Sequence, residues 1–228
     1  MPASIQAAAY ADTEILFDWH KVEGFKGGAI DGIKVIVRGT DGAAQTMVGI
    51  DLLFATSHIP TPSDGANVSI DVAPTTLGTT GAAVDTPGWF NNLVGYVPVT
   101  AGDFNDADLI YLNVANVNLS GEEIPVSGDL YVAAVAKGAL DFRTTARVNE
   151  TGFAAGAQTV ITVDTKDITL GFAPGDVVHA VDDAVLGTIK TVDSATQITL
   201  TKANVDAIAD SDIIYNVSPI QLILSGTV

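Results

Sequence analysis

The sequence predicts an all-β protein: a β-sandwich or jelly-roll-like N-terminal domain followed by a small β-barrel or hairpin module. Short apolar stretches alternate with Gly, Pro, Asn and Asp along all 228 residues, which is typical of strands joined by turns. The acids are 22 Asp and 5 Glu, and Asp favours turns where Glu favours helix surfaces. The apolar fraction of 47% with only 7% aromatics indicates a folded, mainly aliphatic core.

Turn dipeptides and alternation place the strands of the N-terminal domain. Asp31-Gly32 and Asp41-Gly42 are expected to be turns on either side of the first of these strands. Helix is expected only as a turn or two near Trp89–Leu93 and Ala203–Ala209. The expected strands are Ile33–Arg38, Met47–Phe54, Asn67–Val72, Leu93–Val99, Leu109–Val117 and Leu130–Ala136.

A polar segment, Asp141–Thr151, separates two candidate domains, 1–147 and 148–228. The last strand is ambiguous, because it could complete the second module or return to the first sheet. We favour the return, with 148–216 as an insertion and 217–226 as the returning strand, since Asp210–Asn216 already closes the module. The strands expected in 148–228 are Thr159–Val163, Val177–Val181, Val185–Val192 and Thr196–Thr201, with Pro219–Leu224 as the last strand.

The charge distribution excludes some partners. The net charge is −17, and residues 39–136 contain eleven acids but no Lys or Arg. A surface without cations cannot neutralise phosphates, so we expect no nucleic-acid or membrane binding. The same negative charge favours a partner whose binding surface is basic, with solubility alone as the alternative. The absence of cysteine excludes disulfides and thiol chemistry. No apolar run reaches the length of a membrane-spanning helix, and the N-terminus is unlike a signal peptide, so synthesis in the cytoplasm is expected.

The sequence predicts no catalytic site and no cofactor. The three histidines, His20, His58 and His179, lie in no metal-binding or triad spacing, and the usual nucleophile and phosphate-loop motifs are missing. The remaining metal candidate is a run with Asp103, Asp106 and Asp108, whose oxygens could surround calcium. The alternative for this run is a solvated acidic loop.

Three segments of the N-terminal domain form a recognisable series: a strand ending in LLF, a glycine-containing strand and an LYV-A-V-A strand. They are Asp51–Ala55, Asn92–Pro98 and Asp129–Gly138. In this order they resemble the head decoration, or capsid cement, proteins of tailed bacteriophages. The second module is similar to small β units of phage structural proteins. The similarity lies in Phe172–Val178, Leu186–Ile189 and Val192–Leu200.

The resemblance implies a structural virion protein and not an enzyme. It implies a homotrimer on the outer capsid surface, made in the host cytoplasm, that binds the major capsid protein at three-fold positions and stabilises contacts between its copies. The Ala-rich segment Met1–Ile15 is expected to be a weakly structured arm that orders against the capsid. The cations in Lys21–Arg38 and from Lys137 onward are the candidates for contacts with acidic groups of the shell or of other subunits.

Exposed aromatic side chains are the candidates for partner contacts. For Trp19 and His20 the alternative is local packing. Two other functions remain open: a carbohydrate-binding or adhesin-type β-sandwich that uses Trp19, Trp89 and Tyr96, and a calcium-assisted hydrolase that uses the Asp103 loop. The interface candidates are Trp19, His20, Phe25, Trp89 and Phe90.

Overall fold

The structure is a computed structural model. It describes residues 2–3, 9–22, 24–25, 27–40, 44–56, 93–105, 112–143, 146–149, 152–164, 168–169, 171–180 and 184–227. Within these residues the regular structure is β, apart from the short 3-10 turn η3 (Ala101–Asp103). The all-β class predicted from the sequence is therefore confirmed.

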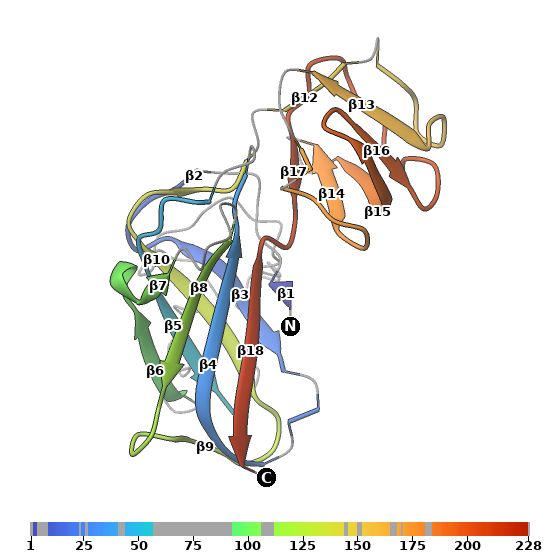
Figure 1. Ribbon diagram of the computed structural model, residues 1–228. Helices are drawn as coiled ribbons and strands as arrows, with labels where there is room; N and C mark the ends of the chain where they lie inside the picture. The colour runs from blue at the N-terminus through green and yellow to red at the C-terminus, as the bar shows by residue number, and fades with distance from the viewer. Residues whose placement is uncertain are drawn as a thin grey trace, which may run out of the picture.

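The first unit is a sandwich of two antiparallel sheets (Figure 1). The sheet that we call the β18 sheet has the order β1-β18-β4-β8-β7, and β9 also pairs with β4. The sheet that we call the β10 sheet has the order β3-β10-β5-β6. The strands of the β18 sheet are β1 (Pro2–Ala3), β4 (Gly28–Arg38), β7 (Phe104–Asn105), β8 (Leu112–Asn118), β9 (Ile124–Val126) and β18 (Ile220–Thr227). Those of the β10 sheet are β3 (Ile15–Lys21), β5 (Gly49–Ala55), β6 (Leu93–Val99) and β10 (Tyr131–Lys137).

Side-chain alternation explains how the two sheets pack. In β4 the side chains of Ile33, Val35 and Val37 are buried, whereas Lys34 between them is exposed. The β18 sheet therefore buries one face and leaves the other to solvent. In β10 every residue from Val132 to Ala136 is buried, so the β10 sheet is covered on both faces. The inner faces form one aliphatic core, and a second apolar cluster around Trp19 lies on the outer face of the β10 sheet.

The second unit is a small barrel with a core of its own. Its six strands have the order β12-β13-β16-β15-β14-β17. An antiparallel bridge between Arg147 and Ile213 brings the two ends of this order together, so the sheet almost closes. The predicted β-barrel module is thereby confirmed. The strands are β12 (Arg147–Val148), β13 (Val160–Asp164), β14 (Val177–Ala180), β15 (Val185–Ser194), β16 (Gln197–Leu200) and β17 (Ile214–Asn216).

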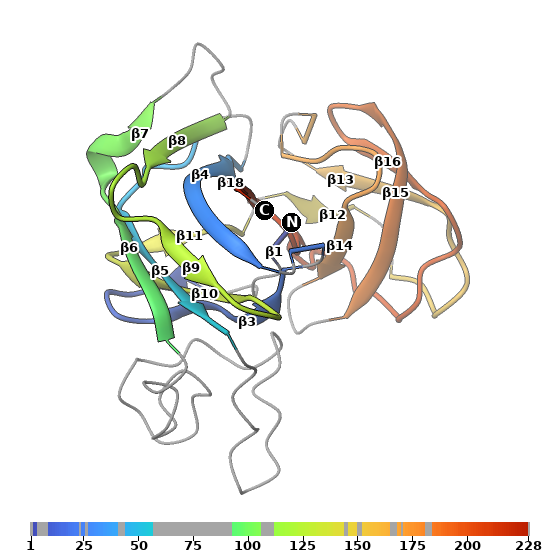
Figure 2. The ribbon, with the colours of Figure 1, turned by 90° about the horizontal axis from the view of Figure 1, so that it is seen from below.

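The last strand belongs to the sandwich and not to the barrel. Between β17 and β18 the chain leaves the barrel, and β18 then pairs antiparallel with β4 over its whole length. The barrel strands thus lie in the sequence between β11 (Leu140–Asp141), which pairs with β2 (Ala9–Tyr10), and β18. Figures 1 and 2 show the barrel beside one end of the sandwich, with β17 leading directly into β18.

A polar junction joins the two units. At the end of β4 the backbone N–H of Arg38 donates to the carbonyl of Pro219, at 2.8 Å. The Arg38 guanidinium donates to the carboxylate of Asp176, which precedes β14. The same carboxylate oxygen accepts hydrogen bonds from the Asn216 side-chain amide at 2.9 Å and from the Ala173 N–H at 2.7 Å. The last residues of β4 are therefore tied to the start of β14 and the end of β17.

Three local predictions are wrong. Asp31-Gly32 is not a turn but lies inside β4, because β4 pairs with β8 and β18 through these residues. Ala203–Ala209 forms bends and no helix, since its backbone bonds to Gln158, Leu186 and Val185. The N-terminal segment is not a loose arm where it is described, because β1 pairs with β18 and Tyr10 is only 3% exposed. The predicted strand at 67–72 lies outside the described residues.

Candidate functional site

The solvent face of the β18 sheet carries a row of polar side chains from three neighbouring strands. In the register of the sheet, Lys34 of β4 lies between Ile223 of β18 and Asn116 of β8. The next row contains Ser225 and Asn118 on either side of Gly32. Because residues at i and i+2 of a strand share a face, the two asparagines point the same way as the lysine. We call this surface the Lys34 face.

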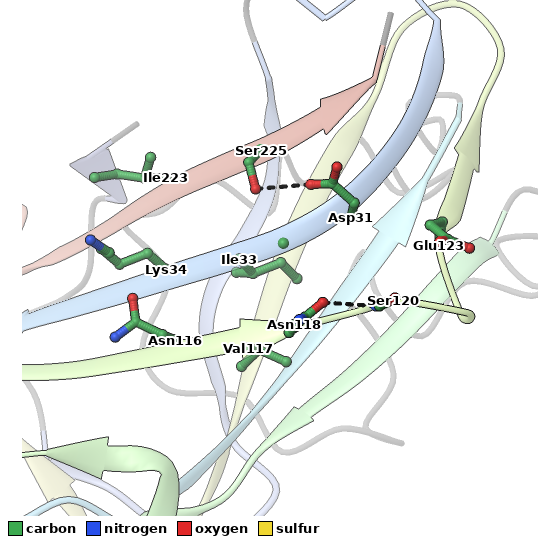
Figure 3. A pocket seen from close by; sticks show the side chains of 11 residues that line it. Asp31, Ile33, Lys34, Asn116, Val117, Asn118, Ser120, Glu123, Ile223 and Ser225 are labelled. Carbon is green, nitrogen blue, oxygen red and sulfur yellow. Dashed lines mark hydrogen bonds between the residues drawn. The ribbon is translucent and has the colours of Figure 1, made fainter.

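The Lys34 face contains an open pocket of about 660 Å³ (Figure 3). Asp31 and Glu123 lie toward one end of it, and Lys34 and Ile223 lie toward the other. Gly32 keeps the middle free, since a Cβ at this position would come within 2.6 Å of the Ser225 hydroxyl oxygen. Gly32 was predicted to form a turn. Its missing side chain instead leaves room for the Ser225 hydroxyl beside β4, where it reaches Asp31.

Hydrogen bonds hold the acids of this pocket. The Ser225 hydroxyl donates to the Asp31 carboxylate at 3.0 Å. The carboxylate of Glu123 accepts from the Gly121 N–H at 3.1 Å, and backbone hydrogen bonds of this kind lower the pKa of Glu123. Both acids therefore face the pocket with partners already in place, which leaves the lysine as the group most available to a ligand.

Lys34 differs from the other described cations of the sandwich in its surroundings. Within the described residues its ammonium group makes no ion pair, whereas the other four cations do. The chemistry that this face offers is one ammonium group beside two side-chain amides, a set that binds carboxylates and other polar oxygen groups. The pairs of the other four are Lys21 with Asp129, Arg38 with Asp176, Lys137 with Asp51 and Arg143 with Asp141.

The metal candidate is described only at Asp103. Its carboxylate turns back and accepts hydrogen bonds at 2.7 Å from both the N–H and the hydroxyl of Thr100, at the start of η3. Asp106 and Asp108 lie outside the described residues. Within the described part of the chain, no three acids or histidines are grouped closely enough to hold a metal ion. Asp103 therefore has a local structural role.

The hydrogen bonds from Thr100 should set the acid–base behaviour of Asp103. The hydroxyl bond is the larger cause of its lowered pKa and the backbone bond the second. We expect Thr100→Val to raise the pKa of Asp103 toward its ordinary value, as measured by NMR titration of the carboxyl carbon. Because the pKa of Asp103 is lowered in the folded state, its carboxylate stabilises the fold at pH values above the ordinary pKa of an aspartate. This stabilisation is lost as the pH falls through the folded-state pKa. Asp193, whose pKa is lowered by Thr199 and Thr191, serves as the internal control and should not move.

The interface candidates have different surroundings. Trp19 is 9% exposed and packs in the outer cluster of the β10 sheet, so it is not an exposed anchor on this chain. His20 is half-buried and meets the Phe17 ring edge-on, at 5.6 Å between ring centres. Phe25 is half-buried and packs against the sandwich core. Trp89 and Phe90 lie outside the described residues.

The proposed aromatic platform for a glycan is only partly present in the described residues. Tyr96 is 53% exposed, but Trp19 is buried and lies on another strand. Burial, together with a hydrogen bond to the Asp51 carboxylate, raises the pKa of Tyr96. The Lys137 ammonium lies 3.4 Å from the same carboxylate. This tyrosine is therefore part of a polar cluster with an acid and a cation.

Sequence reasoning missed the Lys34 face as a unit. The alternation in Leu112–Asn118 does place Asn116 and Asn118 on one face of a strand. What the sequence does not contain is the register that brings them beside Lys34 and Ile223, because those residues come from distant parts of the chain.

Comparisons with known proteins do not assign the chain to a family. Protein-family models, curated proteins and solved structures were all searched, and none matches. Among the described residues there is no helix of the length and apolar character that crossing a bilayer requires. Its own structure defines the chain as an all-β protein, a two-sheet sandwich into which a small barrel is inserted.

Proposed function

We propose that this chain is a structural virion protein that binds the outer surface of a phage capsid and stabilises contacts between major capsid proteins. The proposal rests on the resemblance of its strand segments to capsid decoration proteins. The Lys34 face is the observation that supports it most directly, because it gives this acidic chain a surface able to hold acidic groups of a partner.

The architecture of this face suits a docking role. Its polar groups stand on three paired strands whose opposite side is packed in the sandwich core, so little side-chain or backbone ordering is needed on binding. The pocket is open to solvent and continues into the polar row on the three strands. An extended, open surface of this kind fits a protein partner.

The chain would stabilise the capsid by binding two neighbouring capsid proteins at once. A chain bound to two neighbouring capsid proteins must release both before they can separate, and the second contact forms at high effective concentration. The homotrimer that the resemblance implies would multiply the contacts again. Strong overall negative charge would keep the unbound protein soluble.

A co-sedimentation experiment tests this function. The full chain is mixed with empty shells assembled from the major capsid protein of the same genome, and bound protein is measured in the pellet across a salt series. We expect saturable binding, weakened at least about tenfold by Lys34→Glu because one attractive contact becomes repulsive. Lys202→Glu, an exposed lysine in the barrel unit, makes the same change of charge and should bind like the natural chain.

The possible results of this experiment test the capsid-binding function and the role of the Lys34 face separately. If the natural chain does not pellet with shells, the capsid-binding function is wrong. If it binds and both lysine variants bind equally well, the function stands and the Lys34 face is not the contact. Deletion of Met1–Ile15 is a poor test, since it removes the buried Tyr10 along with the β1 strand.

A further inference from the structure

A β-bulge in β4 places an acidic side chain on the Lys34 face. Gly32 and Ile30 pair with consecutive residues of β18, so Asp31 between them is the extra residue of the bulge. Ile30 and Ile33 are both buried, and Asp31 and Gly32 between them both line the pocket. On a regular strand, residues three apart lie on opposite faces, so the bulge is what brings Asp31 to the same face as Lys34.

The residues of β18 beside the bulge are fitted to it. The two backbones approach so closely that a Cβ at Gly226 would come within 2.2 Å of the Ala29 carbonyl oxygen. The neighbouring Ser225 hydroxyl donates to the Asp31 carboxylate at 3.0 Å. A carboxylate has about four acceptor positions, so this bond sets the direction of Asp31 and leaves other positions to a ligand. Bulges that re-aim a side chain in this way are typical of binding and active sites.

The pocket on the Lys34 face has opposite charges at its two ends. Asp31 and Glu123 lie at one end, and Lys34 lies at the other (Figure 3). Three residues of β4 separate Asp31 from Lys34, which corresponds to about 10 Å. This is about one Debye length at roughly 0.1 M salt, so each end acts mainly on the charge that contacts it. Ile223, which is 46% exposed, lies beside Lys34 and adds an apolar contact.

We propose that the Lys34 face binds a segment of the major capsid protein that carries an acidic and a basic side chain about 10 Å apart. The acidic one contacts Lys34, and the basic one contacts Asp31 and Glu123. This binding mode rests on the proposed function and specifies its partner. A segment with acids alone would gain a contact at Lys34 but place negative charge against two carboxylates, and a segment with bases alone would do the reverse.

The order of the two charges would also orient the chain on the shell. A segment that lay across β4 in the reversed direction would meet a like charge at each end of the pocket, which costs binding free energy twice. The polar groups stand on three paired strands, so they do not rearrange to suit the reversed segment. The face therefore selects one direction of its partner.

A charge-swap series in co-sedimentation with empty shells tests this order. Glu123→Lys reverses the negative end and should weaken binding at least about tenfold. In the double variant Lys34→Glu/Glu123→Lys the two charge changes cancel, so the net charge stays at −17, yet binding should be weaker than in either single variant. Glu122→Lys is the matched control, because Glu122 is exposed and adjacent in sequence but does not line the pocket. Its binding should change by no more than about twofold.

A milder variant guards against a change in the turn before β9. Glu123→Gln keeps an oxygen that can accept from the Gly121 N–H and removes only the charge. It should keep the melting temperature of the natural chain and weaken binding by about threefold or more. Binding by Glu123→Gln that equals that of the natural chain would show that the negative end makes no contact, and the proposal would be wrong.

The direction of each change identifies the partner. Stronger binding by Glu123→Lys would mean that the partner surface is acidic throughout, and stronger binding by Lys34→Glu would mean that it is basic throughout; either result overturns the proposal. A double variant that binds like the natural chain would show that only the overall charge matters, which also overturns it. In these three cases the natural chain still pellets with shells and the capsid-binding function stands. A natural chain that does not pellet overturns that function and this binding mode together.

Discussion

Asn204→Ala is expected to destabilise the barrel by about 2–3 kcal/mol. Asn204 is 1% exposed, and its side chain bonds three backbone groups. Its carbonyl oxygen accepts from the Gln158 N–H at 2.8 Å, and its amide donates to the carbonyls of Ala154 at 2.9 Å and Asp206 at 2.6 Å. Truncation leaves these groups unpaired beside a small cavity. Because the residues that carry them are themselves exposed, water can replace part of the loss, which keeps the estimate below the sum of three buried bonds.

The position of the tryptophans makes this prediction easy to measure. Both, Trp19 and Trp89, lie in residues 1–147, so tryptophan fluorescence does not report the barrel directly, whereas calorimetry detects both units. In the variant the barrel's calorimetric transition should move to lower temperature by more than the fluorescence midpoint. Asn149→Ala, an exposed asparagine next to β12, should leave both signals unchanged. Equal shifts of the two signals would show that the sandwich and the barrel unfold together, so that the variant lowers the stability of the whole chain.

Strand positions follow from local pattern, and several were predictable for that reason. Leu93–Val99 was predicted with the bounds that β6 has, and the alternation at 196–201 contains β16. The segment at 196–201 alternates between apolar and polar residues, a period that only an extended chain can place on one face, whereas Leu93–Val99 is a short and mostly apolar run. Part of the aliphatic core could likewise be predicted, because in β4 and β16 the buried residues occur at alternate positions, whereas β5 and β10 bury consecutive residues.

Features that depend on pairing could not be predicted in the same way. Asp-Gly is a good turn signal, but at Asp31-Gly32 the hydrogen-bonded neighbours β8 and β18 keep the chain extended. Trp19 looked like a possible anchor because nothing local shows that the β10 sheet is covered on both faces. The Lys34 face and the junction at Arg38 join residues far apart in the sequence, so single-sequence patterns carry no signal for them.

Arg38→Met is expected to destabilise the chain at neutral pH by about 1–3 kcal/mol, by leaving the Asp176 carboxylate without its cation. The side chains of the pair are 27% and 14% exposed, so the penalty lies below that of a fully buried pair. The double variant Arg38→Met/Asp176→Asn should recover much of the loss, because it removes the charge together with its partner. Arg143→Met is the matched control: the side chains of that pair are 37% and 44% exposed, and its loss should be about 0–1 kcal/mol.

The pH dependence identifies the charge as the cause. Burial raises the pKa of Asp176, and the Arg38 charge opposes that rise. Without the arginine the folded-state pKa should rise further above the unfolded value, so the carboxyl group binds its proton more tightly when folded. Stability is then highest below the unfolded pKa and is lost as the pH rises through the folded-state pKa. Urea unfolding from acid to neutral pH should therefore show the gap between Arg38→Met and the natural chain widening as the pH rises. In the double variant, which has no carboxyl group to ionise, that widening should be absent; a gap of constant size would instead assign the loss to packing of the arginine stem.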